Sequence, residues 1–176
     1  NFPAWRLARA VTLAELTRSL PIAAAQFEYS LVHRAPEADL LPASRALGLA
    51  AVTWSPLGGG MLTGKYRRGE GGRAQALGGK VFQAEDSAQR SAVLDVVLAV
   101  AEELRATPDQ VAIAWVARRG VLPLIGPRSL AQLRSNLGAT ALVLSAQQAA
   151  RLDAAGAAAA ETTQAATSEA ALLPVA

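Results

Sequence analysis

The chain contains no cysteine, and this absence removes disulfides, thiolate metal sites and a cysteine nucleophile from consideration. His33 is the only histidine. One histidine cannot build a histidine metal site by itself, so we predict no bound metal. No run of about 18 apolar residues without charge occurs, so we predict no membrane-spanning helix.

Positive charges exceed negative charges only slightly. The net charge is only +3, and the densest basic cluster, residues 65–68, is interrupted by Tyr66. A nucleic-acid surface requires a broader basic face, so we predict no nucleic-acid partner. A local site for an anion fits this pattern of charge better.

The amino-acid composition is typical of a globular protein. Of the 176 residues, 52 % are hydrophobic and 18 % are charged, which is enough apolar material for one domain with its own core. The first residues, Asn1-Phe2-Pro3, are neither an initiator methionine nor the start of a signal peptide. We therefore expect this chain to begin inside a longer protein.

Helix and strand patterns alternate along the sequence. Apolar spacing and capping residues predict helices over residues 5–20, 35–47, 87–104, 108–118, from Ser129 onward and from Ser145 to Ala155. Short apolar runs predict strands over residues 22–29, 49–55 and 121–125. Residues 58–79 are glycine-rich and predict a long functional loop. Repeated strand–helix units favour a parallel α/β sheet. The spacing is compatible with a doubly wound sheet and with an incomplete (β/α)8 barrel, since a barrel takes about 250 residues.

Ligands bind at the carboxyl ends of the strands in both of these architectures, which directs attention to two segments. Residues 54–60 follow a strand with a tryptophan and three successive glycines, whose exposed amides suit an anion. Residues 126–129 join a strand to a helix N-terminus and include Arg128, whose guanidinium suits a phosphate. A buried core tryptophan before a flexible turn explains the first segment equally well. A Ser129 N-cap beside a solvated arginine explains the second.

Several blocks in this order make residues 1–156 similar to the aldo-keto reductases. They are Asn1-Phe2, residues 26–31, 54–60, 62–66 and 107–112, and Gly126-Pro127-Arg128 with Gln132-Leu133 and Asn136-Leu137. The resemblance implies the C-terminal half of a (β/α)8 TIM barrel, followed by an alanine-rich tail over residues 157–176. It further implies a cytoplasmic oxidoreductase that uses NADPH to reduce small aldehydes and ketones to alcohols.

The resemblance also implies a role for particular residues. Asn1 and Gln26 would bind the nicotinamide carboxamide, Trp54 would stack on the nicotinamide ring, and Arg128 would bind the adenosine 2′-phosphate. The other implied cofactor-binding positions are Ser55, Pro56, Leu57, Gly58 and Gly60 along the pyrophosphate, Lys65 and Arg73 in the loop over the cofactor, Gly126 beside Arg128, and Gln132 and Asn136 at the adenine.

The family's catalytic tyrosine, lysine, aspartate and histidine belong to the first half of the barrel, so we assign no catalytic residue here and predict that the isolated chain is inactive. Two alternatives remain open: an NADP-binding regulatory subunit resembling the β-subunits of potassium channels, and an inactive truncation product. A half barrel would leave sheet edges and apolar faces open, which predicts self-association or aggregation.

Overall fold

The structure is a computed structural model that describes residues 2–69 and 83–157. Three parallel strands form its sheet in the order β1 (Ala24–Glu28), β2 (Ala50–Trp54) and β3 (Leu122–Pro123). The predicted parallel α/β arrangement is thereby confirmed. The predicted positions Asn1 and Arg73 and most of the predicted tail lie outside the described residues.

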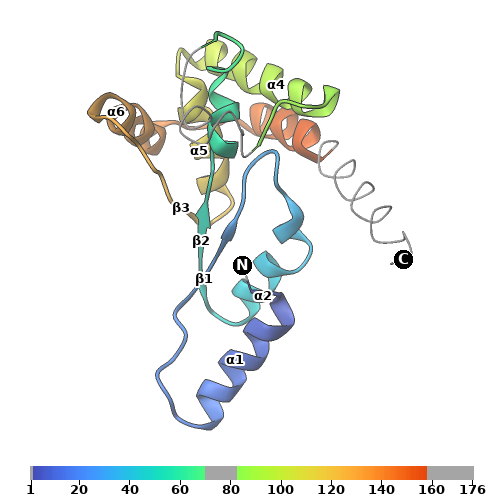
Figure 1. The fold of residues 1–176 in the computed structure, drawn as a ribbon, viewed down its shortest axis with the longest axis vertical. Helices are drawn as coiled ribbons and strands as arrows, with labels where there is room; N and C mark the ends of the chain where they lie inside the picture. Colours follow the sequence, from blue (N-terminus) through green and yellow to red (C-terminus); the bar gives the residue numbers. More distant parts are fainter. Residues whose placement is uncertain (1, 70–82, 158–176) are drawn as a thin grey trace, which may run out of the picture.

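Helical segments lie between the strands and also precede the first strand and follow the last. Figure 1 shows α1 and α2 at one end of the molecule and α4, α5 and α6 at the other. The helical segments are α1 (Ala4–Leu16), η1 (Ala35–Glu37), α2 (Leu40–Ala46), η2 (Gly58–Thr63), α4 (Ala88–Leu104), α5 (Pro108–Arg118), α6 (Leu130–Gly138), η3 (Ala139–Ala141) and a last helix over residues 146–157.

The structure corrects the prediction of one continuous helix over residues 35–47. A 3-10 turn, η1, comes first, and α2 begins anew at Leu40 with Asp39 as its N-cap. Pro42 explains the break, because proline has no N–H and is tolerated only within the first turn of a helix. The predicted loop over residues 58–79 is likewise not all loop, since residues 58–63 form η2.

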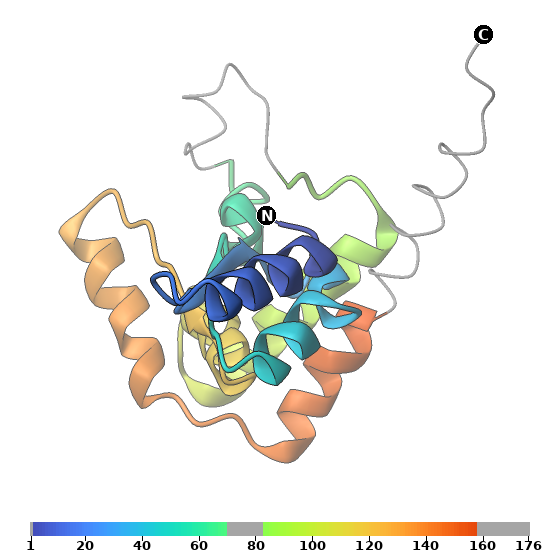
Figure 2. The same cartoon turned by 90° about the horizontal axis from the view of Figure 1, so that it is seen from below.

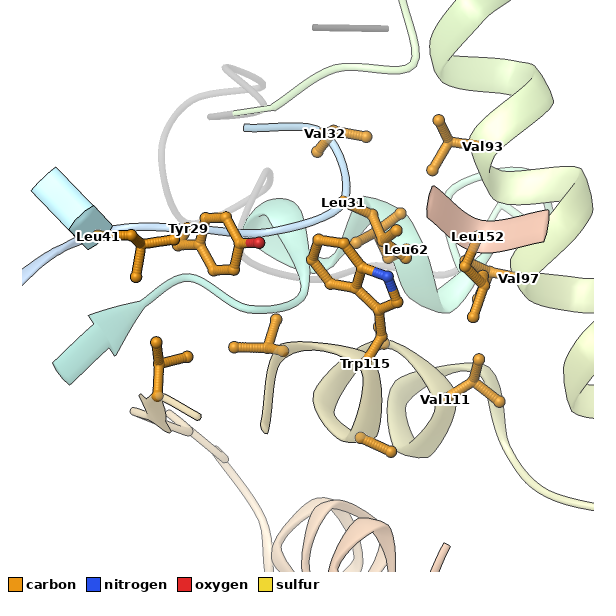
Figure 3. Packing of buried hydrophobic residues seen from close by; sticks show 14 of the residues in the cluster. Tyr29, Leu31, Val32, Leu41, Leu62, Val93, Val97, Val111, Trp115 and Leu152 are labelled. Carbon is orange, nitrogen blue, oxygen red and sulfur yellow. The ribbon is translucent and has the colours of Figure 1, made fainter. Parts of the chain in front are cut away.

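One face of the sheet carries the hydrophobic core. Ala25 and Phe27 point into it, whereas Ala24 and Gln26 point to the other face and are exposed. Helix α5 supplies the centre of the core, and in Figure 2 it lies between α6 and the last helix. Figure 3 shows its Trp115 with Tyr29 on one side and Val97 and Leu152 on the other.

The other face of the sheet is open among the described residues. Leu122 on β3 is 61 % exposed, and Leu124 just beyond the strand is 44 % exposed. Strand β1 is an edge strand, since it pairs only with β2 in this part of the chain. A cleft of about 360 Å³ lies beside β1 and α1, lined by Leu7, Ile22, Gln26 and other residues.

Candidate functional site

The carboxyl ends of the strands bring the predicted segments to one end of the sheet. Glu28 pairs in register with Trp54, and Leu124 N–H donates to the Thr53 carbonyl at 2.7 Å. Because side chains alternate along a strand, Gln26 and Glu28 share a face with Trp54, and this is the open face. Trp54 and Gln26, both predicted to bind the nicotinamide, therefore project from the same face of the sheet.

A strained turn follows Trp54. Ser55 has φ 58°, a left-handed conformation that is uncommon for a residue with a side chain. Its carbonyl accepts from Gly58 N–H at 2.9 Å, and its Oγ accepts from Gly59 N–H at 3.1 Å. Ser55 thus folds the glycine run back on the end of β2. Strain of this kind is concentrated at functional sites.

The glycine run does not expose its amides as the sequence suggested. Gly58 and Gly59 donate to Ser55, and Gly60 N–H donates to the Leu57 carbonyl at 3.0 Å. This prediction was wrong because the run folds into tight turns that satisfy their own donors, with a kink in η2 at Gly59 and Gly60, whose φ angles of 65° and 95° are not helical. Pro56 is buried, and Leu57 is partly buried against the core.

Lys65 and Tyr66 fold back over these glycines. Tyr66 Oη donates to the Gly59 carbonyl at 3.0 Å, and Lys65 Nζ lies 5.0 Å from the centre of the Tyr66 ring. A Cβ on Gly60 would lie 2.9 Å from Lys65 Nζ. The φ of 95° at position 60 favours glycine, since a residue with a side chain would be strained there, whereas the flexible end of Lys65 could move away from an added Cβ.

Residues on both sides of the segment 70–82 are tied together. Arg67 Nε donates to both carboxylate oxygens of Glu85 at 2.7 and 3.0 Å, and its Nη1 donates to Asp95 Oδ1 at 2.5 Å. The hydrogen bond from Arg67 lowers the pKa of Glu85. Gln83 Nε2 donates to Glu28 Oε1 at 2.8 Å, which links this region to the end of β1.

The segment after β3 begins α6. Ser129 Oγ accepts from Gln132 N–H at 3.2 Å, and Gln132 Oε1 accepts from Arg128 N–H at 2.7 Å. The side chain of Gln132, predicted at the adenine, is thus engaged in capping. Arg128 is exposed, and its guanidinium pairs with no side chain in residues 2–69 or 83–157. Gly126 is also exposed, and a Cβ added there would meet no atom of the described residues within 4 Å.

Asn136 also makes bonds within the fold. It is 6 % exposed, and with its amide turned so that the nitrogen faces acceptors, that nitrogen donates to Asp109 Oδ2 at 2.8 Å and to the Gln132 carbonyl at 3.2 Å. These bonds fix α6 to the start of α5. A contact with an adenine would have to use the remaining carbonyl oxygen of this side chain.

Tyr29 belongs to a structural network on the covered side of the sheet. Its ring stacks on Trp115 at 5.5 Å, and its hydroxyl donates to Glu37 Oε1 at 2.5 Å. Burial, and then this hydrogen bond, raise the pKa of Tyr29 above its ordinary range. Burial alone would raise the pKa of Glu37, but hydrogen bonds from Arg34 and Tyr29 outweigh it and lower that pKa. The sequence did not reveal this network, because the bond from Tyr29 to Glu37 depends on how the chain turns after β1 and the stacking partner Trp115 is distant in the sequence.

The described ranges contain neither a membrane-spanning helix nor a cluster of metal ligands. None of their helices combines the length and apolarity that crossing a membrane requires. No group of three acidic or histidine side chains among the same residues could hold a metal ion.

Comparison with known proteins supports the resemblance read from the sequence. The model of the Aldo/keto reductase family matches residues 1–157. An uncharacterized oxidoreductase of Bacillus subtilis, YrpG, is 36 % identical over 146 residues, covering 82 % of this chain and 43 % of that protein. Probable aldo-keto reductase 1 of Glycine max is 35 % identical over 128 residues, covering 71 % and 37 %.

A fungal relative agrees with these two. Aldo-keto reductase str7 of Strobilurus tenacellus is 34 % identical over 142 residues, covering 74 % of this chain and 41 % of that protein. The chain thus spans about two fifths of the length of the curated relatives it matches. By the extent of the family match and the identity to these relatives, the chain belongs to the aldo/keto reductase family.

Proposed function

We propose that this chain is the C-terminal half of a (β/α)8 barrel and holds the NADPH of a reductase whose complete form converts aldehydes and ketones to alcohols. One observation carries the proposal. The parallel strands β1 and β2 present Gln26 and Trp54 on a single open face, with Lys65 and Arg128 in the loops that follow β2 and β3. An amide beside an aromatic ring suits a nicotinamide, and cations suit phosphates.

The open surfaces support the half-barrel part of this proposal. The exposed Leu122 and Leu124 would lie inside a closed barrel, and the free edge of β1, with the cleft beside it, would receive further elements of the parent protein. The same surfaces support self-association of the isolated chain. Size-exclusion chromatography should therefore show dimers or larger species. A monomer that melts cooperatively would count against the half barrel.

Each of the proposed residues would bind a different part of the cofactor. Gln26, with Asn1, would hold the carboxamide, Trp54 would stack on the ring, and Arg128 would bind the 2′-phosphate. Ser55 and Gly60 would meet the diphosphate through the surface of their turn, since the amides of that turn are engaged internally. Gln132 and Asn136 would reach the adenine only with atoms that their capping and interhelix bonds leave available.

The chemistry of this half is binding and orientation. A bound cofactor would supply a hydride, and this chain's own residues would hold the cofactor against the open face of the sheet. Neither of the two tyrosines is placed to protonate a substrate: Tyr29 is buried against Glu37, and Tyr66 donates to Gly59. We therefore propose that the acid and its partners come from the rest of the parent protein and that this chain alone is inactive.

A fluorescence titration tests the cofactor assignment. NADPH should quench Trp54, and a Trp54→Leu variant should lose most of the quenching. A charged hydrogen bond contributes about 1.5–3 kcal/mol, so we expect NADPH to bind about 10- to 100-fold more tightly than NADH, and Arg128→Gln to remove this preference. Arg118→Gln is the matched control, since it removes an exposed arginine at the far end of α5. Equal affinity of the unaltered chain for both cofactors would refute the role of Arg128.

A small carbonyl substrate and a cytoplasmic location belong to the same proposal and depend on family membership. The regulatory alternative shares the cofactor site, so binding alone does not separate the two. Turnover of an aldehyde by the complete parent would favour the reductase. Tight NADPH binding without turnover by that protein would favour a regulatory subunit.

A further inference from the structure

The turn that contains Lys65 and Tyr66 is fastened to the glycine run at successive carbonyls. Tyr66 Oη donates to the Gly59 carbonyl at 3.0 Å, and Thr63 Oγ1 donates to the Gly60 carbonyl at 2.7 Å. The next residue, Arg67, is fixed by Glu85 and Asp95 on the far side of the turn. Side-chain hydrogen bonds therefore join this turn to the glycine run on one side and to Glu85 and Asp95 on the other.

The ammonium of Lys65 places a positive charge beside Gly60. Its Nζ lies over the Tyr66 ring and so close to Gly60 that any Cβ there would meet it at 2.9 Å. No carboxylate in the described parts of the chain forms an ion pair with it. Since the glycine amides donate internally, an anion that reaches Gly60 finds this ammonium rather than a set of free N–H groups.

We propose that Tyr66 is the positioning residue of a diphosphate-binding site in which the Lys65 ammonium, held over Gly60, supplies the charge. The ring of Tyr66 supports the cation from beneath, and its hydroxyl locks the ring to the glycine run. The assignment rests on the proposed function only in taking the ligand to be the diphosphate of a dinucleotide. Lys65 binds the anion, and Tyr66 acts through Lys65.

Calorimetry with three probes tests this inference on the full chain. Inorganic pyrophosphate reports the site alone, NADPH reports the whole cofactor, and adenosine 2′-phosphate reports the Arg128 region without a diphosphate. We expect Lys65→Gln to weaken pyrophosphate and NADPH binding about 10-fold or more. Tyr66→Phe keeps the ring, and we expect it to weaken binding of these two probes about 2- to 10-fold. Tyr66→Leu should weaken their binding more, because it also removes the cation–π contact.

Two further readouts separate positioning from a merely structural role. Adenosine 2′-phosphate should bind all three variants and the control Arg118→Gln with unchanged affinity. The salt dependence of pyrophosphate binding should fall in Lys65→Gln and in Tyr66→Leu, because each removes or displaces the same charge.

The outcomes are distinct. Pyrophosphate affinity that is unchanged in Tyr66→Leu would overturn the inference, and so would an unaltered chain that does not bind pyrophosphate. Equal weakening of all three probes together with a lower melting temperature would make Tyr66 a structural residue and also overturn it. Tyr66-dependent pyrophosphate binding without any NADPH binding would leave this inference standing and refute the proposed function.

Discussion

Thr53 provides the sharpest test of the core beneath the candidate site. It lies in the middle of the sheet, beside Phe27 on β1 and Pro123 on β3, and it is fully buried. Its Oγ1 has no hydrogen-bond partner among residues 2–69 and 83–157. A buried hydroxyl without a partner costs about 1–3 kcal/mol. Thr53→Val keeps the branched shape and removes that hydroxyl, so we expect the free energy of unfolding to rise by about 1–2 kcal/mol.

Urea unfolding followed by circular dichroism measures this change, and a thermal melt should rise by about 2–4 °C for each kcal/mol. The matched control is Thr53→Ser, which keeps the hydroxyl and deletes a methyl group. We expect Thr53→Ser to lower the free energy of unfolding by about 1 kcal/mol. A Thr53→Val variant less stable than the unaltered chain would refute the reasoning, because it would show that the hydroxyl is hydrogen-bonded, for example to a buried water.

The remaining predictions use the same unfolding assay. Asp153→Ala removes the acceptor of the Trp115 Nε1–H bond (2.7 Å) and leaves a buried donor unpaired, so it should cost about 1–3 kcal/mol; no loss would mean that the indole finds another partner. Gly60→Ala places a side chain at φ 95° and should cost about 1–2 kcal/mol, whereas an unchanged midpoint would contradict the strain. The pKa of Glu37 is lowered below 4.5, so its pairing with Arg34 stabilises the fold above pH 4.5. That contribution should vanish as the pH falls through the lowered pKa, and Glu37→Gln should lack this part of the pH dependence.

Local signals in the sequence predicted the elements but not their ends. Thr107, Pro108 and Gln110 mark the start of α5, and the structure begins the helix at Pro108 with Gln110 Oε1 accepting from Thr107 N–H at 3.1 Å. Residues 35–47 have the apolar spacing of one helix, yet Pro42 permits only a restart. That proline was visible in the sequence. Its effect depends on where the preceding turn ends, which apolar spacing does not reveal.

Contacts between distant segments could not be predicted in the same way. Arg67 meets Glu85 and Asp95, and Gln83 meets Glu28, where α4 and the residues before it pack against η2 after the end of β2. Nothing in the spacing of these residues marks them as partners. Tyr66 is a different case, since it stands in a block that the family resemblance already singled out, next to Lys65. Its role follows only from the direction of its hydroxyl toward Gly59.

The glycine run shows why a pattern of residues does not fix a binding mode. Three glycines after a strand are compatible with an open anion-binding nest and with tight turns that close on their own amides, because glycine adopts the positive φ angles that either arrangement can use. Ser55 decides between them here: its left-handed backbone brings both its carbonyl and its Oγ within reach of Gly58 and Gly59. Amides that donate to Ser55 cannot also donate to a phosphate. Charge recognition at this strand end must then come from a side chain, and the side chain held over Gly60 is Lys65.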